Sequence, residues 1–189
     1  MTLPLTGIRA LDLTHVLTGP YCTQILGDLG AEVIKIEKPG VGDQTRRMPP
    51  HFVGGQSAYF LSLNRNKKSL TLDLKNPRGK EIFLNLVKMS DVVVSNFRVG
   101  TMEGLGLGYE DLKTINPRII WTAISGYGQT GPYRDRPSYD ISIQAMGGVM
   151  SYTGEPDGPP VRCGVPIGDL GGSAFAVIGI LSALYRRSI

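Results

Sequence analysis

One aspartate stands in a setting that could support acyl-transfer chemistry. Asp169 lies among glycines, just before an apolar, helix-length segment over residues 173–187. Gly168, Gly171 and Gly172 carry no side chains that would shield the carboxylate, and they let a ligand approach the backbone closely. A carboxylate near free backbone N–H groups stays ionised and can attack an acyl group, while those N–H groups can stabilise an oxyanion.

The same position also has a purely structural explanation. Asp is a preferred N-cap residue, because its side chain accepts a hydrogen bond from a free N–H of the first helical turn. The apolar run over residues 174–185 predicts a buried helix, too short and too interrupted for a membrane span of about 20 residues. The residues alone leave both roles of Asp169 open, a helix cap and a nucleophile.

Basic side chains recur at the predicted carboxyl ends of strands. Lys38, Lys75 and Arg98 each follow a different predicted strand. Ligands of parallel sheets bind beyond these strand ends, so three cations there would suit a ligand with several phosphates. Each one taken singly is better explained as a solvated loop residue. A polyphosphate ligand and a solvated surface therefore both remain open.

Two other features suggest chemistry less strongly. Residues 126–131 fit the G-x-G-x-x-G spacing of dinucleotide-binding loops, but residues 132–137 (PYRDRP) cannot open the required helix. No strand ending in an acid follows about 20 residues on, so NAD binding is not expected. His15 and His51 could act as general bases; their positions favour a local hydrogen-bonding role for His15 and an exposed loop for His51.

Short strands and helices alternate along the chain, which predicts an α/β protein. We expect an open, mainly parallel, Rossmann-like sheet with helices on both faces. The expected strands are residues 8–14, 31–37, 69–74, 91–95 and 119–124. The expected helices are 20–29, 77–87, 109–116 and 138–152, the last capped by Ser138, with a long loop over 38–56.

Composition narrows the function classes. The 189 residues fit one domain, and 41% hydrophobic with 19% charged residues is typical of a soluble protein. The net charge of +4 mildly favours an anionic ligand, but the scattered basic residues do not indicate nucleic-acid binding. Two cysteines and two histidines give neither a disulfide framework nor metal-ligand spacing. Without a signal or transit pattern, a cytoplasmic protein that binds no membrane is expected.

Several segments, in their order and spacing, resemble the family III CoA-transferases, the CaiB/BaiF group that includes formyl-CoA:oxalate CoA-transferase. These segments are residues 5–12 (LTGIRALD), 30–40 (GAEVIKIEKPG), 42–43 (GD), 64–69 (NRNKKS) and 115–118 (INPR), closed by Asp169 in its glycine setting. Residues 64–69, 105–112 and 126–132 are most similar to the succinate/glutarate branch. This likeness implies a dicarboxylic acid as donor or acceptor.

The resemblance implies a mechanism centred on Asp169. Its carboxylate would attack the donor thioester to give a mixed anhydride and free CoA thiolate, which returns to form an aspartyl-CoA thioester; the acceptor acid then reverses the sequence. CoA or acyl-CoA is a substrate in this scheme, and no metal or permanently bound cofactor is implied. The family's CoA-contacting positions match Leu17, Thr18, Lys38, Leu72, Asp73, Leu74, Lys75, Asn96, Phe97, Arg98, Arg136, Pro137, Ser138 and Tyr139.

The α-methylacyl-CoA racemase branch is the nearest alternative within the family. That branch uses a His just before the Asp that corresponds to Asp140, paired with the Asp that matches Asp169. This chain has Tyr139 at the His position. A phenol with a pKa of ~10 is a poor substitute for an imidazole of ~6.5 in proton transfer at neutral pH, which favours the transferase.

Family members are much longer than this chain. They carry a second, smaller domain and a C-terminal return into the first, and they form interlocked homodimers. Residues 1–189 therefore match the N-terminal segment of the large domain. A non-catalytic remnant that binds CoA or a subunit is the alternative from another class, and an uncovered apolar surface would support it.

Overall fold

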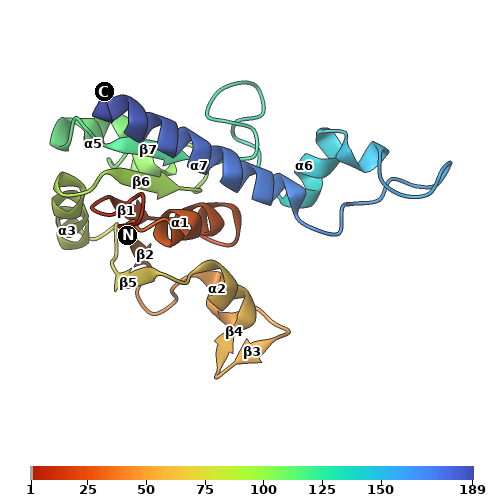
Figure 1. Ribbon diagram of the computed structural model, residues 1–189, viewed down its shortest axis with the longest axis horizontal. Helices are drawn as coiled ribbons and strands as arrows, with labels where there is room; N and C mark the ends of the chain where they lie inside the picture. Colours follow the sequence, from red (N-terminus) through yellow and green to blue (C-terminus); the bar gives the residue numbers. More distant parts are fainter. Residues whose placement is uncertain (1) are drawn as a thin grey trace.

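Five parallel strands form the central sheet of the computed structural model, which describes residues 2–189 (Figure 1). Their spatial order is β5 (Lys67–Thr71), β2 (Glu32–Glu37), β1 (Arg9–Asp12), β6 (Val92–Ser95) and β7 (Ile120–Ala123). Every neighbouring pair runs parallel. The order reverses between β1 and β6, and sheets of this kind bind ligands at such a switch point. The predicted Rossmann-like sheet is confirmed.

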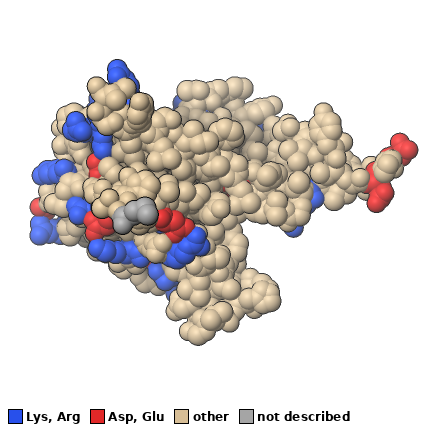
Figure 2. Space-filling view, in the orientation of Figure 1, with Lys and Arg blue, Asp and Glu red and all other residues tan. Residues whose placement is uncertain are grey.

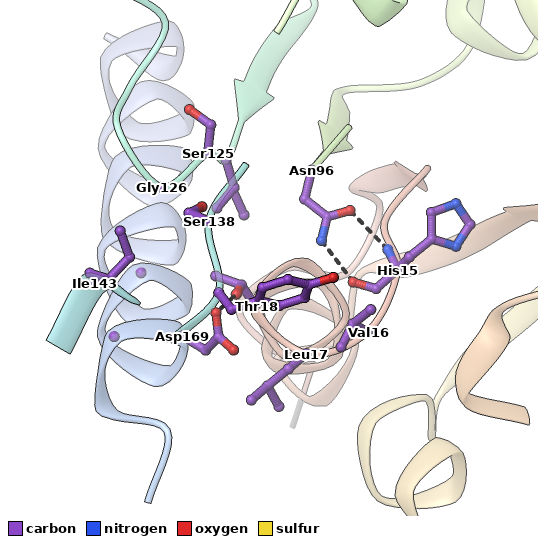
Figure 3. Close-up of a pocket in the computed structure, with 14 residues that line it drawn as sticks. His15, Val16, Leu17, Thr18, Asn96, Ser125, Gly126, Ser138, Ile143 and Asp169 are labelled. Atoms are coloured by element: carbon purple, nitrogen blue, oxygen red, sulfur yellow. Dashed lines mark hydrogen bonds between the residues drawn. The ribbon is translucent and has the colours of Figure 1, made fainter. Parts of the chain in front are cut away.

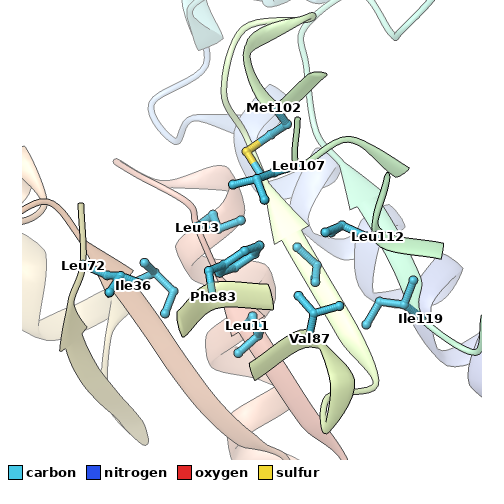
Figure 4. Packing of buried hydrophobic residues seen from close by; sticks show 11 residues of the cluster. Leu11, Leu13, Ile36, Leu72, Phe83, Val87, Met102, Leu107, Leu112 and Ile119 are labelled. Atoms are coloured by element: carbon cyan, nitrogen blue, oxygen red, sulfur yellow. The ribbon is translucent and has the colours of Figure 1, made fainter. Parts of the chain in front are cut away.

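Helices cover both faces of the sheet, as predicted. The helices α1 (Thr18–Asp28) and α7 (Ile167–Ser188) pack on one face, around the buried residues Cys22, Leu26, Val92, Val94, Val177 and Ile180. The other face carries α3 (Pro77–Lys88), α4 (Thr101–Gly104) and α5 (Tyr109–Ile115). Its core is built around Leu11, Phe83, Val87, Val93, Met102 and Leu112 (Figure 4).

Local sequence signals account for the best-predicted elements. All four residues of β6 are buried, as expected for three consecutive valines in a strand covered on both faces. The helix α3 starts where Asn76 accepts a hydrogen bond from the Arg78 N–H and Pro77 fills the first helical turn. Gly30, with a φ of +102°, ends the α1 segment in a conformation that glycine adopts freely.

The long loop predicted over residues 38–56 contains secondary structure. A 3-10 helix, η1 (Gln44–Arg47), begins where the Asp43 side chain accepts a hydrogen bond from the Thr45 N–H. A small hairpin of β3 (Phe52–Val53) and β4 (Gln56–Ser57) follows, and α2 (Ala58–Leu63) comes next. These short elements have no extended hydrophobic period, so the sequence pattern did not predict them.

Two predicted boundaries are also wrong. The strand expected at 69–74 pairs with β2 only over Lys67–Thr71, and the chain then turns out of the sheet. The helix expected at 138–152 divides into α6 (Asp140–Met146) and η2 (Val149–Ser151), because Gly147 and Gly148 interrupt it. Ser138 does not cap α6, whose N-cap residue is Tyr139 without a side-chain hydrogen bond.

The prediction that the apolar segment after Asp169 forms a buried helix is wrong. The helix α7 has 22 residues and buries only Ser173, Val177 and Ile180, whereas Phe175 is 76% and Ile178 57% exposed. By length and composition α7 could cross a membrane, which corrects the prediction that it is too short. Core helices of soluble proteins meet the same criterion, so it is weak evidence, and this helix packs against α1 and β7.

The charged side chains are unevenly distributed over the surface. In Figure 2 they gather at the end of the molecule that carries α3 and α5, whereas the surface over α7 and the β3–β4 hairpin is mostly uncharged. The segment that holds α6 and η2 extends away from the sheet beside the start of α7 (Figure 1).

Candidate functional site

A cavity of about 400 Å³ lies at the switch point of the sheet, beyond the carboxyl ends of β1, β6 and β7 and beside the first turn of α7 (Figure 3). Five separate parts of the chain line it, namely the loop between β1 and α1 with the start of α1, the residue after β6, those after β7, the start of α6 and the first turns of α7. The lining residues are His15, Val16, Leu17, Thr18, Asn96, Ile124, Ser125, Gly126, Ser138, Tyr139, Ile143, Gly168, Asp169 and Gly172.

Asp169 lies in this cavity and does not cap its own helix. It is the third residue of α7, and its Oδ1 accepts a 2.5 Å hydrogen bond from the Thr18 hydroxyl. Thr18 is the first residue of α1, so the starts of two helices meet at the carboxylate. The buried Ser173 hydroxyl strengthens this junction by donating to the carbonyls of Thr18 (2.7 Å) and Asp169 (2.8 Å).

The backbone N–H groups of the first turn of α7 are already engaged. Gly168 N–H and Asp169 N–H donate to the same oxygen, Oδ1 of Asp140, at 2.8 and 3.3 Å. Ile167 N–H donates to the Val165 carbonyl and Leu170 N–H to the Pro166 carbonyl. The prediction that free amides beside Asp169 could stabilise an oxyanion is therefore wrong for residues 167–170.

The electrostatic environment makes Asp169 a more basic carboxylate than usual. Burial raises its pKa above the ordinary value of 3.8, and the negative charge of Asp140 raises it further, whereas the hydrogen bond from Thr18 opposes both effects. A more basic carboxylate is a better nucleophile once it has lost its proton. The charge of Asp169 also acts on Tyr59. Burial and the negative charge of Asp169 both raise the pKa of the Tyr59 hydroxyl.

The loop that carries Thr18 is held by two hydrogen bonds from the neighbouring strand end. His15 N–H donates to Oδ1 of Asn96 at 2.9 Å, and Nδ2 of Asn96 donates to the His15 carbonyl at 2.7 Å (Figure 3). The His15 ring stacks on Phe97 with 5.3 Å between ring centres. Val16 adopts a φ of +69°, which is strained for a β-branched residue and occurs where surrounding structure enforces it.

A network of buried charges supports the floor beneath this loop. Lys67 lies 3.0 Å from Asp12, and Lys35 lies 3.0 Å from Asp43, with all four side chains at most 2% exposed. Burial by itself would raise the pKa of Asp12, but Lys67 and Lys35 outweigh it and lower that pKa to about 2. His15 lies 3.9 Å from Asp43, and burial lowers the pKa of its imidazole.

The residues predicted to contact CoA lie in different places in the structure. Leu17, Thr18, Asn96, Ser138 and Tyr139 line the Asp169 cavity. A second cavity of about 290 Å³ shares Asn96, Ser125, Gly126, Ser138 and Tyr139 with it, and adds Phe97, Arg98, Val99, Arg134, Asp135, Arg136 and Pro137.

The remaining predicted positions lie elsewhere. Lys38 lines a third cavity with Arg46 and Arg47. Leu72 is buried in the hydrophobic core, and Asp73, Leu74 and Lys75 line none of these three cavities. The expected cluster of Lys38, Lys75 and Arg98 is thus not brought together in one cavity. Arg98 instead joins Arg134 and Arg136.

Some residues of the site were missed by sequence reasoning. Arg134 was not singled out, nor were the roles of Asp140 and the buried Gln144, which is 1% exposed. The spacing of four residues between this Asp and this Gln, at the start of a predicted helix, indicates that the two side chains can hydrogen-bond to each other. Within residues 2–189, no three His, Cys, Asp or Glu side chains gather as metal ligands.

Comparison with known proteins shows the family of this chain. The profile described as CoA-transferase family III matches residues 5–188. The chain belongs to this family. A solved CaiB/BaiF family protein from Brucella suis is 45% identical, with a TM-score of 0.95 over 100% of this chain and 50% of that chain.

Family members with assigned names are similarly close. The chain is 52% identical to succinyl-CoA:glutarate CoA-transferase of Mus musculus and to acetyl-CoA:oxalate CoA-transferase of Acetobacter aceti, over 97% of its length in both cases. It is 47% identical to formyl-CoA:oxalate CoA-transferase of Rhodopseudomonas palustris over its whole length. It spans 42%, 47% and 44% of these three relatives, which is less than half of each.

Proposed function

We propose that residues 1–189 form the N-terminal segment of the large domain of a CoA-transferase, which moves CoA from an acyl-CoA to a small carboxylic acid through an aspartyl-CoA thioester on Asp169. The observation that carries this proposal is the carboxylate itself. It lies in a cavity at the switch point of the sheet, with one oxygen held by Thr18 and with raised basicity.

The proposed reaction has four acyl-exchange steps. Asp169 attacks the thioester carbonyl of the donor, which forms a mixed anhydride and releases CoA thiolate. The thiolate attacks the aspartyl carbonyl, which forms the aspartyl-CoA thioester and releases the donor acid. The acceptor carboxylate then attacks this thioester, and the released thiolate attacks the acceptor carbonyl of the new anhydride, which gives acceptor-CoA and free Asp169. Every step exchanges one activated acyl group for another, without oxidation or net loss of a proton.

The two adjoining cavities suit the two ends of an acyl-CoA. The acyl group would lie beside Asp169, and the phosphates would lie near the three guanidinium groups of Arg98, Arg134 and Arg136. The two cavities share Asn96, Ser138 and Tyr139, so one ligand could extend through both. This arrangement supports CoA as a substrate that comes and goes.

A dicarboxylic acid is the proposed donor or acceptor, supported by the names of the relatives, which include glutarate and oxalate. Among the described residues that line the Asp169 cavity there is no Lys or Arg. A second carboxylate bound there would therefore need a cation from beyond this lining, and the neighbouring arginine cavity is the nearest candidate.

Proton transfer by a racemase-like mechanism is less well supported. Tyr139, which stands at the position of the racemase histidine, is 79% exposed. His15 is the histidine in the cavity lining, but its ring stacks on Phe97 and points away from Asp169 (Figure 3). Homodimerisation and a cytoplasmic location remain predictions from the sequence.

A mass spectrum of the protein after incubation with succinyl-CoA tests the nucleophile. We expect a covalent CoA adduct that hydroxylamine removes, and we expect none in Asp169→Asn. Asp157→Asn, which changes an exposed acid that lines neither cavity, is the matched control and should behave as wild type. Reversible CoA binding without an adduct would refute the catalytic proposal and favour a CoA-binding remnant.

A further inference from the structure

Asp140 occupies the place that an anion would take at the start of α7. Its Oδ1 accepts hydrogen bonds from both Gly168 N–H and Asp169 N–H, although it belongs to α6. The positive end of a helix dipole and its unpaired N–H groups normally stabilise a nearby carboxylate. Here Asp140 receives that stabilisation, and Asp169 does not.

Gln144 holds Asp140 in this position. Its Nε2 donates to Oδ2 of Asp140 at 2.6 Å, and its Oε1 accepts from the Cys163 N–H at 2.8 Å. Gln144 is 1% exposed and lies one helical turn after Asp140. The side chain therefore connects α6 with the segment that leads into α7, and it leaves Oδ1 of Asp140 directed at the helix start.

The space around this contact is tightly filled. A Cβ atom at Gly168 would lie 3.1 Å from Oδ1 of Asp140 and 3.4 Å from a methyl carbon of Ile143. A glycine at this position thus allows the carboxylate to approach the backbone closely. Gly168 therefore lets the Asp140 carboxylate of α6 contact the backbone at the start of α7 directly.

We propose that Asp140, oriented by Gln144, is a positioning residue for the nucleophile: it binds the first-turn amides of α7, fixes Asp169 toward Thr18, and leaves the Asp169 carboxylate without those amides as partners. The consequence for the reaction rests on the proposed function. The consequence for Asp169 itself does not, because it follows from the contacts of Asp140.

Titration of Asp169 is the readout that a purely structural role of Asp140 would not move. The charge of Asp140 contributes to the raised pKa of Asp169. The other titratable groups near the site are His15 and Tyr139 in the cavity lining, and Tyr59 on α2. None of these three groups is a carboxylate, so the carboxyl carbon-13 signal of Asp169 is observed separately from them.

The test is a carbon-13 carboxyl NMR titration of Asp169 in wild type, Asp140→Asn and Asp140→Ala. Asn keeps an acceptor oxygen but removes the charge, and we expect the pKa of Asp169 to fall. Ala also frees the two amides for Asp169, so its pKa should fall further. Asp157→Asn is the control and should leave it unchanged, because Asp157 is exposed and lines neither cavity. If Asp140→Ala does not fold, the Asn variant alone decides the outcome.

The amide resonances of Gly168 and Asp169 provide the second readout. Their chemical shifts should differ between wild type and Asp140→Asn, because the acceptor of both hydrogen bonds changes from a carboxylate to a neutral amide. An unchanged pKa of Asp169 in Asp140→Asn would overturn the proposal. If wild type forms no CoA adduct, the proposed function fails, but the NMR comparison still decides the role of Asp140. If adducts form, Asp140→Ala should form them at least tenfold more slowly at neutral pH.

Discussion

The hydroxyl oxygen of Thr18 lies 2.5 Å from Oδ1 of Asp169, although 151 residues separate the two in the chain. Thr18 opens α1 and Asp169 lies in the first turn of α7, so the contact joins the starts of two helices. One oxygen of the carboxylate is thereby held in place. The other oxygen, Oδ2, is the one that we propose attacks the acyl group.

Removal of the Thr18 hydroxyl should slow the reaction of Asp169. The hydrogen bond fixes one oxygen of the carboxylate, and a misplaced reacting group can lose about a hundredfold in rate, so Thr18→Val should form the CoA adduct roughly ten- to a hundredfold more slowly. Thr18→Ser keeps the hydroxyl and should stay close to wild type. Time-resolved mass spectrometry of the adduct measures both rates, and a wild-type rate in Thr18→Val would show that this contact does not position the nucleophile.

Neutralising Asp169 should stabilise the protein at neutral pH. The pKa of Asp169 is raised in the folded protein. The contribution of this carboxyl group to folding stability is therefore complete below the ordinary pKa of 3.8, and it is lost as the pH rises through the raised pKa. Asp169→Asn should therefore unfold at a higher temperature than wild type at pH 7, with no such gain at pH 3. Asp157→Asn serves as control, and a gain that is equal at both pH values would contradict this reasoning.

Two adjacent lysines should differ sharply in their effect on stability. The Lys67 side chain is 2% exposed and pairs with the fully buried Asp12, whereas Lys68 is 73% exposed and pairs with Glu32. Lys67→Met leaves a buried carboxylate without its partner and should lower the free energy of unfolding by about 3–5 kcal/mol. Lys68→Met should change it by less than about 1 kcal/mol.

Urea denaturation measures this difference, and acid supplies a second check. The pKa of Asp12 is lowered to about 2, so its contribution to stability is present above the ordinary value of 3.8 and is lost as the pH falls through about 2. The excess cost of Lys67→Met should thus shrink over that window. Equal costs for the two lysine variants would mean that the buried pair does not support the fold.

Neighbouring isoleucines on α7 test which face of this helix is covered. Ile180 is 1% exposed. Ile180→Ala should lower the free energy of unfolding by about 2–5 kcal/mol, because the variant leaves a cavity in the core. Ile178 is 57% exposed, and the free energy of unfolding of Ile178→Ala should lie within about 0.5 kcal/mol of the wild-type value. Denaturant unfolding compares the two. A large cost at Ile178 would indicate that another molecule of the chain covers this face.

Local sequence patterns were sufficient for the class of fold. The valines of β6 predict a strand buried on both faces, and Asn76 with Pro77 predicts the start of α3; both signals involve residues that are close in the chain. The alternation of such elements predicts a parallel sheet, and its strand ends locate the site. Asp169 was recognisable as a candidate because the glycines that expose it are also close to it in the chain.

Contacts between distant segments decided the rest. Sequence position allowed Asp169 to be a helix cap, but Asp140 binds the amides and Thr18 binds the carboxylate, across 29 and 151 residues. Likewise, an apolar run does not reveal which of its faces a sheet covers, so the exposure of α7 was not foreseeable. Hydrogen-bond partners and burial depend on which surfaces meet in space, and only the tertiary structure determines that.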